Sequence, residues 1–234
     1  LMQQDGSIVP GIPMFRKTFQ LSGNVRRARL YATGLGVYNV FINGERVGQT
    51  DEDGNTLYDE LKPGATEMKK TVFYTTHDVT ALLQEGKNAI GAEVSSGWWN
   101  GAIVHGMYGG KPNAFRALLK IELEDGNTQV IPTDLSWLSN TNGPLRKGDV
   151  YNGETYDARL EDGQFTPDYD DSNWFGVAES ADFKGEIRAF EGPAIMAVEA
   201  LRRYPQTIQI YEGTKSNGKT FGTINVVEEI AGQN

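Results

Sequence analysis

The chain has 234 residues, of which 38% are hydrophobic and 10% aromatic, with 28 glycines and no cysteine. These values fit a folded, loop-rich protein with one large or two modest β domains, and they exclude disulfides, thiolate metal sites and a cysteine nucleophile. A net charge of −9 argues against nucleic acid or an anionic membrane surface as a partner.

The termini and the hydropathy pattern carry three further expectations. No apolar run is long enough to span a bilayer, so no membrane-spanning helix is expected. Residues 1–10 lack a basic stretch followed by an apolar one, so we expect no signal peptide. Because the chain begins with Leu1 rather than Met, we expect it to be a trimmed piece of a longer protein.

The N-terminal third predicts short strands separated by turns. Strands are expected over 14–21 and 27–33. Asn43-Gly44 lies between the strand-like segments 36–42 and 46–48. This dipeptide is the strongest short hairpin signal, because both central residues of the turn take positive φ.

The middle of the chain continues this pattern toward a tryptophan-rich loop. A strand is expected over 71–76. Asp78 then suits the N-cap of a single helical turn that reaches Leu83. The strand expected over 88–94 leads directly into Gly97–Gly101, where the two tryptophans lie.

The clearest half-buried strand is the apolar series Leu119, Ile121 and Leu123, which alternates with charged residues. Asp125-Gly126 turns it back into 128–131. Strands at about ten-residue spacing predict an all-β chain, folded as an antiparallel β-sandwich of jelly-roll type, with no helix longer than about two turns. Trp174 follows an acidic turn and is expected to plug into the sandwich.

Two adjacent indoles lie between glycines in Ser95-Ser96-Gly97-Trp98-Trp99-Asn100-Gly101. The flanking Gly and Ser favour an exposed turn. Indole faces in such a loop would suit the C–H face of a sugar ring, with Asn100 as a polar neighbour. The alternative is that both indoles fold back onto the core, since large aromatic side chains are usually buried. Of the two, Trp98 is expected to be the more exposed.

Few residues indicate self-contained catalysis. Of the two histidines, His77 is expected to be structural, whereas His105 is open between a structural role and a place in the tryptophan loop. No nucleophile elbow, phosphate loop or dinucleotide fingerprint occurs. The carboxylate runs lie in turn contexts that are typical of solvated faces, so no catalytic pair is expected.

Residues 151–159 bring together an amide, two carboxylates and a cation, in Asn152, Glu154, Asp157 and Arg159. One interpretation is a buried or semi-buried ion pair of Arg159 that fixes a crossing loop. The other is that Asn152, Glu154 or Asp157 gives oxygens to sugar hydroxyls or to a calcium ion.

Several segments carry a family resemblance in their order and content. They are residues 29–38 running into 41–48, residues 78–80 with 88–91, the Gly97-Trp98 pair, and residues 152–159. Together they resemble the N-terminal, non-catalytic β-sandwich domain of bacterial α-L-rhamnosidases of the glycoside hydrolase family 78 type. The resemblance runs from about Met14 to Trp174.

This resemblance implies a galactose-binding-domain-like sandwich within an enzyme that hydrolyses terminal α-L-rhamnose with inversion. Related enzymes carry their catalytic carboxylates on a separate helical barrel, so the chain itself is expected to be inactive. Its partners would be a rhamnose-containing saccharide and the catalytic domain of the same polypeptide. Some relatives bind rhamnose through such a domain with a bridging calcium ion. A periplasmic or extracellular location is expected for the parent enzyme.

The expected organisation is an N-terminal extension over 1–13, the sandwich over 14–191, and a linker with the first part of a following β domain over 192–234. Two functions stay open for the sandwich. It either binds carbohydrate, with Trp98, Trp99, Asn100, His105, Asn152, Glu154 and Asp157 as candidate residues, or it is a structural domain that packs on the catalytic barrel and orients it.

Overall fold

The computed structural model describes residues 2–3, 11–51, 54–104, 112–181, 183–196, 204–214 and 220–229. The chain divides into two compact units, Leu1–Met196 and Ala197–Asn234. The second unit is an antiparallel hairpin of β17 (Tyr204–Thr214) and β18 (Thr220–Glu229). The domain boundaries expected at residues 13 and 191 stay predictions.

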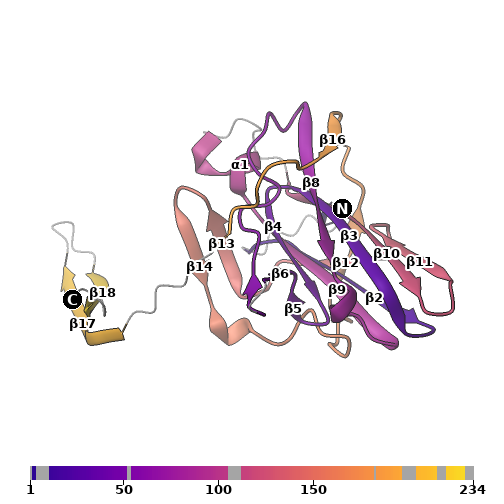
Figure 1. Cartoon of the computed structure of the whole chain (residues 1–234). Helices are drawn as coiled ribbons and strands as arrows, with labels where there is room; N and C mark the ends of the chain where they lie inside the picture. Colours follow the sequence, from indigo (N-terminus) through magenta and orange to yellow (C-terminus); the bar gives the residue numbers. More distant parts are fainter. Residues whose placement is uncertain are drawn as a thin grey trace. The chain divides into compact units, whose positions relative to one another are not determined.

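The first unit is a sandwich of two sheets (Figure 1). One sheet has seven strands in the order β1 (Met2–Gln3), β15 (Phe175–Ala178), β12 (Leu138–Asn140), β2 (Met14–Leu21), β9 (Gly86–Ser95), β4 (Val37–Ile42) and β5 (Glu45–Arg46). All its pairings are antiparallel.

The second sheet has five strands in the order β11 (Thr128–Pro132), β10 (Ala114–Leu123), β3 (Val25–Leu35), β8 (Thr71–Asp78) and β16 (Glu186–Ala189). Only β16 runs parallel to its neighbour, β8, within this sheet. Two small hairpins complete the described strands, β6 (Gln49–Thr50) with β7 (Thr56–Leu57) and β13 (Leu145–Asp149) with β14 (Gly153–Tyr156).

The described helical segments are all short. They are η1 (Thr80–Leu82), α1 (Gly97–Asn100), η2 (Ala102–Val104) and η3 (Ala158–Leu160). Within the described ranges, none is long and apolar enough to cross a membrane. The antiparallel all-β fold expected from the sequence is therefore confirmed.

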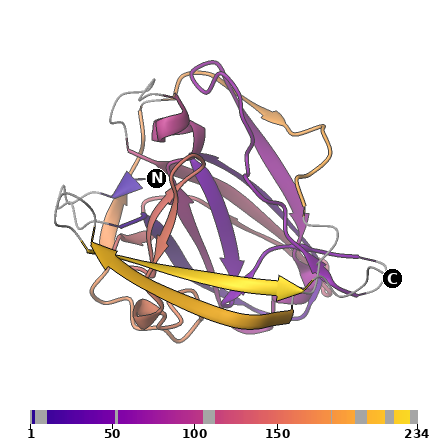
Figure 2. The ribbon, with the colours of Figure 1, turned by 90° about the vertical axis from the view of Figure 1, so that its left-hand side faces the viewer.

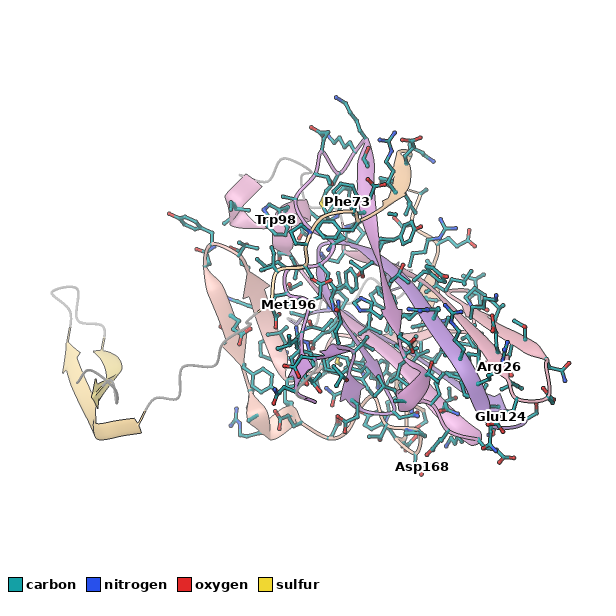
Figure 3. All side chains as sticks on the ribbon, in the orientation of Figure 1. Arg26, Phe73, Trp98, Glu124, Asp168 and Met196 are labelled. Carbon is teal, nitrogen blue, oxygen red and sulfur yellow. The ribbon has the colours of Figure 1, made fainter. Side chains whose placement is uncertain are left out.

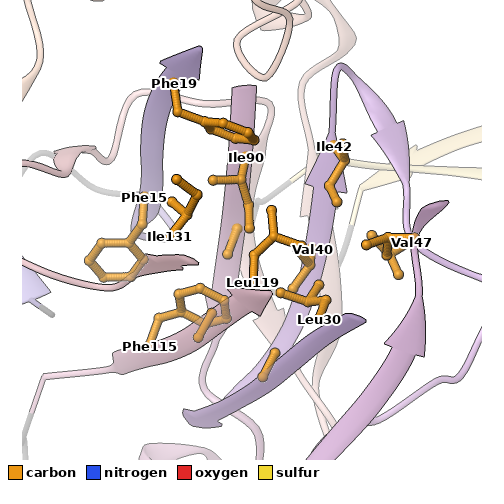
Figure 4. Packing of buried hydrophobic residues seen from close by; sticks show 14 of the residues in the cluster. Phe15, Phe19, Leu30, Val40, Ile42, Val47, Ile90, Phe115, Leu119 and Ile131 are labelled. Carbon is orange, nitrogen blue, oxygen red and sulfur yellow. The ribbon is translucent and has the colours of Figure 1, made fainter. Parts of the chain in front are cut away.

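The core lies between the inward faces of the two sheets (Figure 4). Phe15, Val40 and Ile90 come from the seven-stranded sheet, and Leu30 and Leu119 come from the five-stranded sheet. Period-2 alternation puts every second side chain of each strand into this layer. The burial of these residues removes apolar surface from water, which is the main force that holds the sheets together.

The predicted strands and the hairpin are present with small shifts at their ends. Asn43 and Gly44 take φ values of 53° and 91°, as the two-residue turn between β4 and β5 requires. Trp174 is buried in a smaller cluster with Met14 and Phe165, which confirms the expected plug. The Asp78 carboxylate accepts a 3.1 Å bond from the Thr80 N–H, but the turn is a 3₁₀ segment and Val79 holds its N-cap position.

The segment that contains β16 has no clear hydrophobic periodicity in its sequence. The chain passes from β15 in the seven-stranded sheet to β16 at the edge of the five-stranded sheet. β16 pairs with β8 on one side only and has a largely exposed, charged sequence, with Glu186 and Arg188 forming an ion pair. An edge strand of this kind lacks the hydrophobic alternation that would predict it.

Candidate carbohydrate-binding site

The tryptophan-bearing loop forms a single helical turn at one end of the sandwich, beside the β13–β14 hairpin (Figures 1 and 2). Gly97 begins α1 with a φ of +50°, and a Cβ there would lie 2.6 Å from Val37 Cγ2. Glycine is needed at this position for both reasons. The Ser96 N–H donates to the Gly148 carbonyl at 3.1 Å, which fixes the start of α1 to strand β13.

Trp99 is a core residue with 1% of its surface exposed. It packs in a cluster that includes Leu35, Val72 and Ala114, and its indole Nε1–H donates to the Pro112 carbonyl at 3.0 Å. The ring therefore offers no face to a sugar in this structure. Trp99 follows the alternative that the sequence left open, an indole folded back onto the core.

Trp98, which is labelled in Figure 3, is half-buried and packs against the same cluster. Its neighbour Asn100 is also half-buried, and its Nδ2 lies 3.3 Å from Asn113 Oδ1. Asn113 in turn donates to the carbonyls of Leu35 and Ser95, at 3.0 Å each. Asn100 is thereby connected to the ends of two core strands, β3 and β9.

The turn between β13 and β14 is organised by Asp149. Its Oδ2 accepts a bond from the Ala102 N–H at 2.7 Å, and its Oδ1 accepts from the N–H groups of Tyr151 and Asn152 at 2.9 and 2.8 Å. Burial raises the pKa of this carboxyl, but the three N–H donors outweigh it and hold the pKa below its ordinary value of 3.8. An ionised Asp149 therefore joins the hairpin to the segment that follows α1.

We define the tip as residues 97–104 together with 149–152. Three side chains of the tip are exposed apolar or aromatic groups, namely Ile103, Val150 and Tyr151, and Tyr151 is 77% exposed. With half-buried Trp98 they give this end of the molecule a mixed surface of rings, aliphatic groups and backbone polar atoms. Such a surface is chemically suited to a sugar, which has both C–H faces and hydroxyls.

Sequence reasoning missed Asp149 and Tyr151. The signal for the first was present, because Asp149 opens a turn that ends at Gly153, and an aspartate at the first position of a turn bonds to N–H groups two and three residues on. Tyr151 carried no such signal, because only the fold shows that its ring is exposed to solvent.

The other predicted residues of this hairpin are spread along it. Asn152 lies in the tip, and Glu154 pairs with Gly148 one step down the ladder. Asp157 lies beyond the end of β14, where its N–H donates to the Pro144 carbonyl at 2.8 Å. Of these three residues, only Asn152 therefore belongs to the tip.

The ion pair expected within residues 151–159 is present, but the expected burial holds only for Asp157, whose side chain is 27% exposed. Arg159 Nε and Nη2 donate to Asp157 Oδ1 and Oδ2 at 2.8 and 2.6 Å, a bidentate pair. The hydrogen bonds from Arg159 lower the pKa of Asp157 to about 2. However, the Arg159 side chain is 88% exposed, because the two residues lie only two positions apart on a surface turn. The pair therefore does not anchor a buried loop.

His77 is buried, with 3% of its surface exposed, and its Nε2 lies 2.9 Å from Thr75 Oγ1. Burial, and to a smaller extent the charge of Lys62, lowers its pKa to about 4, so the ring is neutral at pH 7. This agrees with the structural role expected for it. His105 lies outside the described residues.

Metal binding finds little support in the geometry. Over the ranges that the structure describes, no three His, Asp or Glu side chains are grouped closely enough to hold a metal ion. The calcium site therefore remains a prediction from the family resemblance.

The two facing, mainly antiparallel sheets define the class of the chain, a β-sandwich domain. A model of the α-L-rhamnosidase N-terminal domain matches residues 23–199, so the chain belongs to that family. The chain is similar to an α-L-rhamnosidase of Formosa agariphila, with 40% identity over 69% of this chain and 17% of that protein. It is also similar to one of Streptomyces avermitilis, with 38% identity over 75% of this chain and 16% of that protein.

Solved structures give the same result. The crystal structure of the Streptomyces avermitilis α-L-rhamnosidase complexed with L-rhamnose matches with a TM-score of 0.73 and 35% identity, over 85% of this chain and 19% of that chain. The α-L-rhamnosidase from Dictyoglumus thermophilum matches with a TM-score of 0.69 and 35% identity, over 85% of this chain and 21% of that chain. The chain thus spans less than a quarter of the length of these relatives.

Proposed function

We propose that this chain is a non-catalytic accessory domain of an α-L-rhamnosidase and that its tip binds a rhamnose-containing saccharide. In this proposal the exposed side of Trp98 and the ring of Tyr151 contact the sugar's C–H faces. Polar groups of the turn, including Asn152, contact its hydroxyls. Hydrolysis of terminal α-L-rhamnose takes place on another domain of the parent enzyme.

The observation that supports this most is that Asp149, at the end of β13, joins the hairpin to η2, the segment that follows α1. A binding surface works best when its groups are already fixed, because fewer side chains lose freedom on binding. The three bonds to Asp149 fix the backbone on both sides of the tip, while Tyr151 stays exposed between them. Membership of the rhamnosidase family suggests which sugar to test first.

The second candidate is a structural domain that packs on the catalytic domain and orients it. The burial of Trp99 favours this candidate, because one of the two tryptophans then serves the core and not a ligand. In that case the exposed apolar groups of the tip would be covered by another domain in the parent enzyme. The two functions predict different behaviour of the isolated chain toward sugars.

The test is a calorimetric titration of the chain with L-rhamnose, with and without calcium, on the wild type and on Tyr151→Ala and Trp98→Ala. Tyr156→Ala is the matched control, because Tyr156 is an exposed tyrosine of the same hairpin that lies outside the tip. We expect the wild type and the control to bind, and both tip variants to lose most of the affinity.

Absence of rhamnose binding by well-folded wild type in both conditions would reject the binding function and favour the structural one. Equal loss in the control and the tip variants would place the site elsewhere. As a separate check, the isolated chain is expected to release no rhamnose from an aryl rhamnoside. Turnover that survives repurification and is lost on mutating one of its carboxylates would contradict the accessory role.

A further inference from the structure

The outward face of the five-stranded sheet carries a second set of ligand-like groups. Residues opposite each other in an antiparallel pair point to the same face. The register of β10 with β3 pairs Arg116 with Thr33, Leu118 with Tyr31, and Lys120 with Arg29. The pattern along β10 is buried at Ala117, Leu119 and Ile121 and exposed at Arg116, Leu118 and Lys120, so these pairs face away from the core.

The middle of this face is hollowed. Two adjoining hollows of about 380 and 460 Å³ share Thr33, Arg116, Thr133 and Ile187 in their walls. The second hollow is also lined by Tyr31, Tyr74 and Leu118. The rings of Tyr31 and Tyr74 meet edge to face, with centroids 6.1 Å apart, and Leu118 is 41% exposed. The floor therefore offers aromatic and aliphatic surface between strands.

Cations border this floor on two sides. Arg116 lies on one side, and it makes no hydrogen bond or ion pair with any residue in the described ranges. Arg29 and Lys120 form a cross-strand pair on the other side. Lys120 is four residues beyond Arg116 along β10, which is about 13 Å at the usual rise of a strand. Arg27 follows in the next row.

These cations are only partly neutralised. Arg29 is 3.6 Å from Asp78, and Glu122 is shared by Lys120 at 3.1 Å and Arg26 at 2.8 Å. With Arg27 and Arg116, five cations of β3 and β10 thus stand against two carboxylates, in a chain whose net charge is −9. Glu179 lines the first hollow but not the second, so an anionic group is better accommodated in the second hollow, which Arg116 lines and beyond which Lys120 follows along β10.

We propose that this face binds an extended anionic polysaccharide, one that bears carboxylate or sulfate groups. The rings of Tyr31 and Tyr74 would contact sugar rings, and Arg116 and Lys120 would pair with acidic groups on either side. Arginine suits this task because its planar guanidinium can bond to a carboxylate or sulfate through two N–H groups. This goes beyond the rhamnose site proposed above and uses none of the residues of the tip.

The test is affinity electrophoresis of the chain through gels that contain polygalacturonate, dextran sulfate or neutral dextran. Variants are Arg116→Ala and Tyr74→Ala. The matched control is Lys87→Ala, which removes one exposed cation that pairs with Asp168 elsewhere on the surface. Thermal melting of each variant checks that it is folded.

We expect at least one polyanion to retard the chain and neutral dextran not to retard it. Retardation by polygalacturonate would identify carboxylate as the group recognised, and retardation by dextran sulfate would identify sulfate. Arg116→Ala should weaken retardation about tenfold, as the loss of one charge-assisted hydrogen bond would, while the control should match the wild type. Trp98→Ala should still be retarded, which separates this site from the rhamnose site.

Two results would overturn the proposal. The first is an absence of retardation by both polyanions, which would leave this face as a contact surface for another domain of the polypeptide. The second is an equal loss in Arg116→Ala and Lys87→Ala, which would show that any retardation reflects overall charge.

Discussion

Trp98 and Trp99 are neighbours on one helical turn, yet Trp99 is buried and Trp98 only half-buried. Consecutive residues of a helix are rotated by about 100°, so when one indole points into the sandwich the next points along its surface. Trp99 fills the space between Leu35, Val72 and Ala114, whereas Trp98 covers only the edge of that cluster. The inner side of α1 therefore contributes to stability, and the outer side is available for binding.

The largest expected effect is on the inner side. Trp99→Ala should lower the free energy of unfolding by about 3 to 5 kcal/mol, because it leaves a cavity in the packed cluster. Trp98→Ala should cost far less, since its ring is partly in water already. Urea unfolding of both variants measures the difference, and equal losses would mean that the two rings are equally part of the core.

A second contrast lies between two arginine–aspartate pairs. Arg16 is fully buried, with Nη1 3.2 Å from Asp171 Oδ2 and Nη2 2.7 Å from the Thr166 carbonyl. Arg16→Met should destabilise the chain by about 3 kcal/mol, because it leaves these acceptors without their buried partner. Arg159→Met removes the exposed pair with Asp157 and should cause no measurable change in urea unfolding. A reversed order would refute the assignment of the two environments.

Buried His77 gives a pH-dependent form of the same contrast. Its folded pKa of about 4 lies below its ordinary value of 6.5, so the unfolded chain binds a proton more readily between these values. Stability should therefore fall as the pH is lowered from 6.5 to 4, by at most about 3 kcal/mol, and this contribution should level off below pH 4. In His77→Gln this part of the slope should vanish. An unchanged slope would assign it to other groups.

Asp149 is expected to contribute less to stability than Trp99, Arg16 or His77. Asp149→Ala removes three backbone acceptor contacts at a half-exposed position, and we expect a loss of about 1 kcal/mol. Because the folded pKa of this carboxyl is depressed, its contribution is present at neutral pH and is lost as the pH falls below 3.8. The same variant should weaken L-rhamnose binding more than Tyr156→Ala does. Binding equal to that of the wild type would remove Asp149 from the site.

The sandwich was predictable because its signals are local. Leu119, Ile121 and Leu123 alternate with charged residues, and Asn43-Gly44 accepts the positive φ values of a tight turn. β16 escaped prediction, because an edge strand with one neighbour needs no apolar face.

The candidate site was only partly predictable. Its tryptophans are visible in the sequence, and Trp98 was expected to be the more exposed. The complete burial of Trp99 depends on Leu35, Val72 and Ala114, which lie far from it in the sequence and meet it only in the fold. The roles of Asp149 and Tyr151 depend in the same way on the approach of β13 to α1.

The most direct test of the account is to follow the indole N–H resonances of the four tryptophans by NMR during a titration with L-rhamnose. Trp98→Phe assigns one resonance. We predict that the Trp98 resonance shifts with the sugar, while those of buried Trp99, Trp137 and Trp174 stay in place. A titration at saturating L-rhamnose in which Trp98 does not move would contradict a sugar site at the tip.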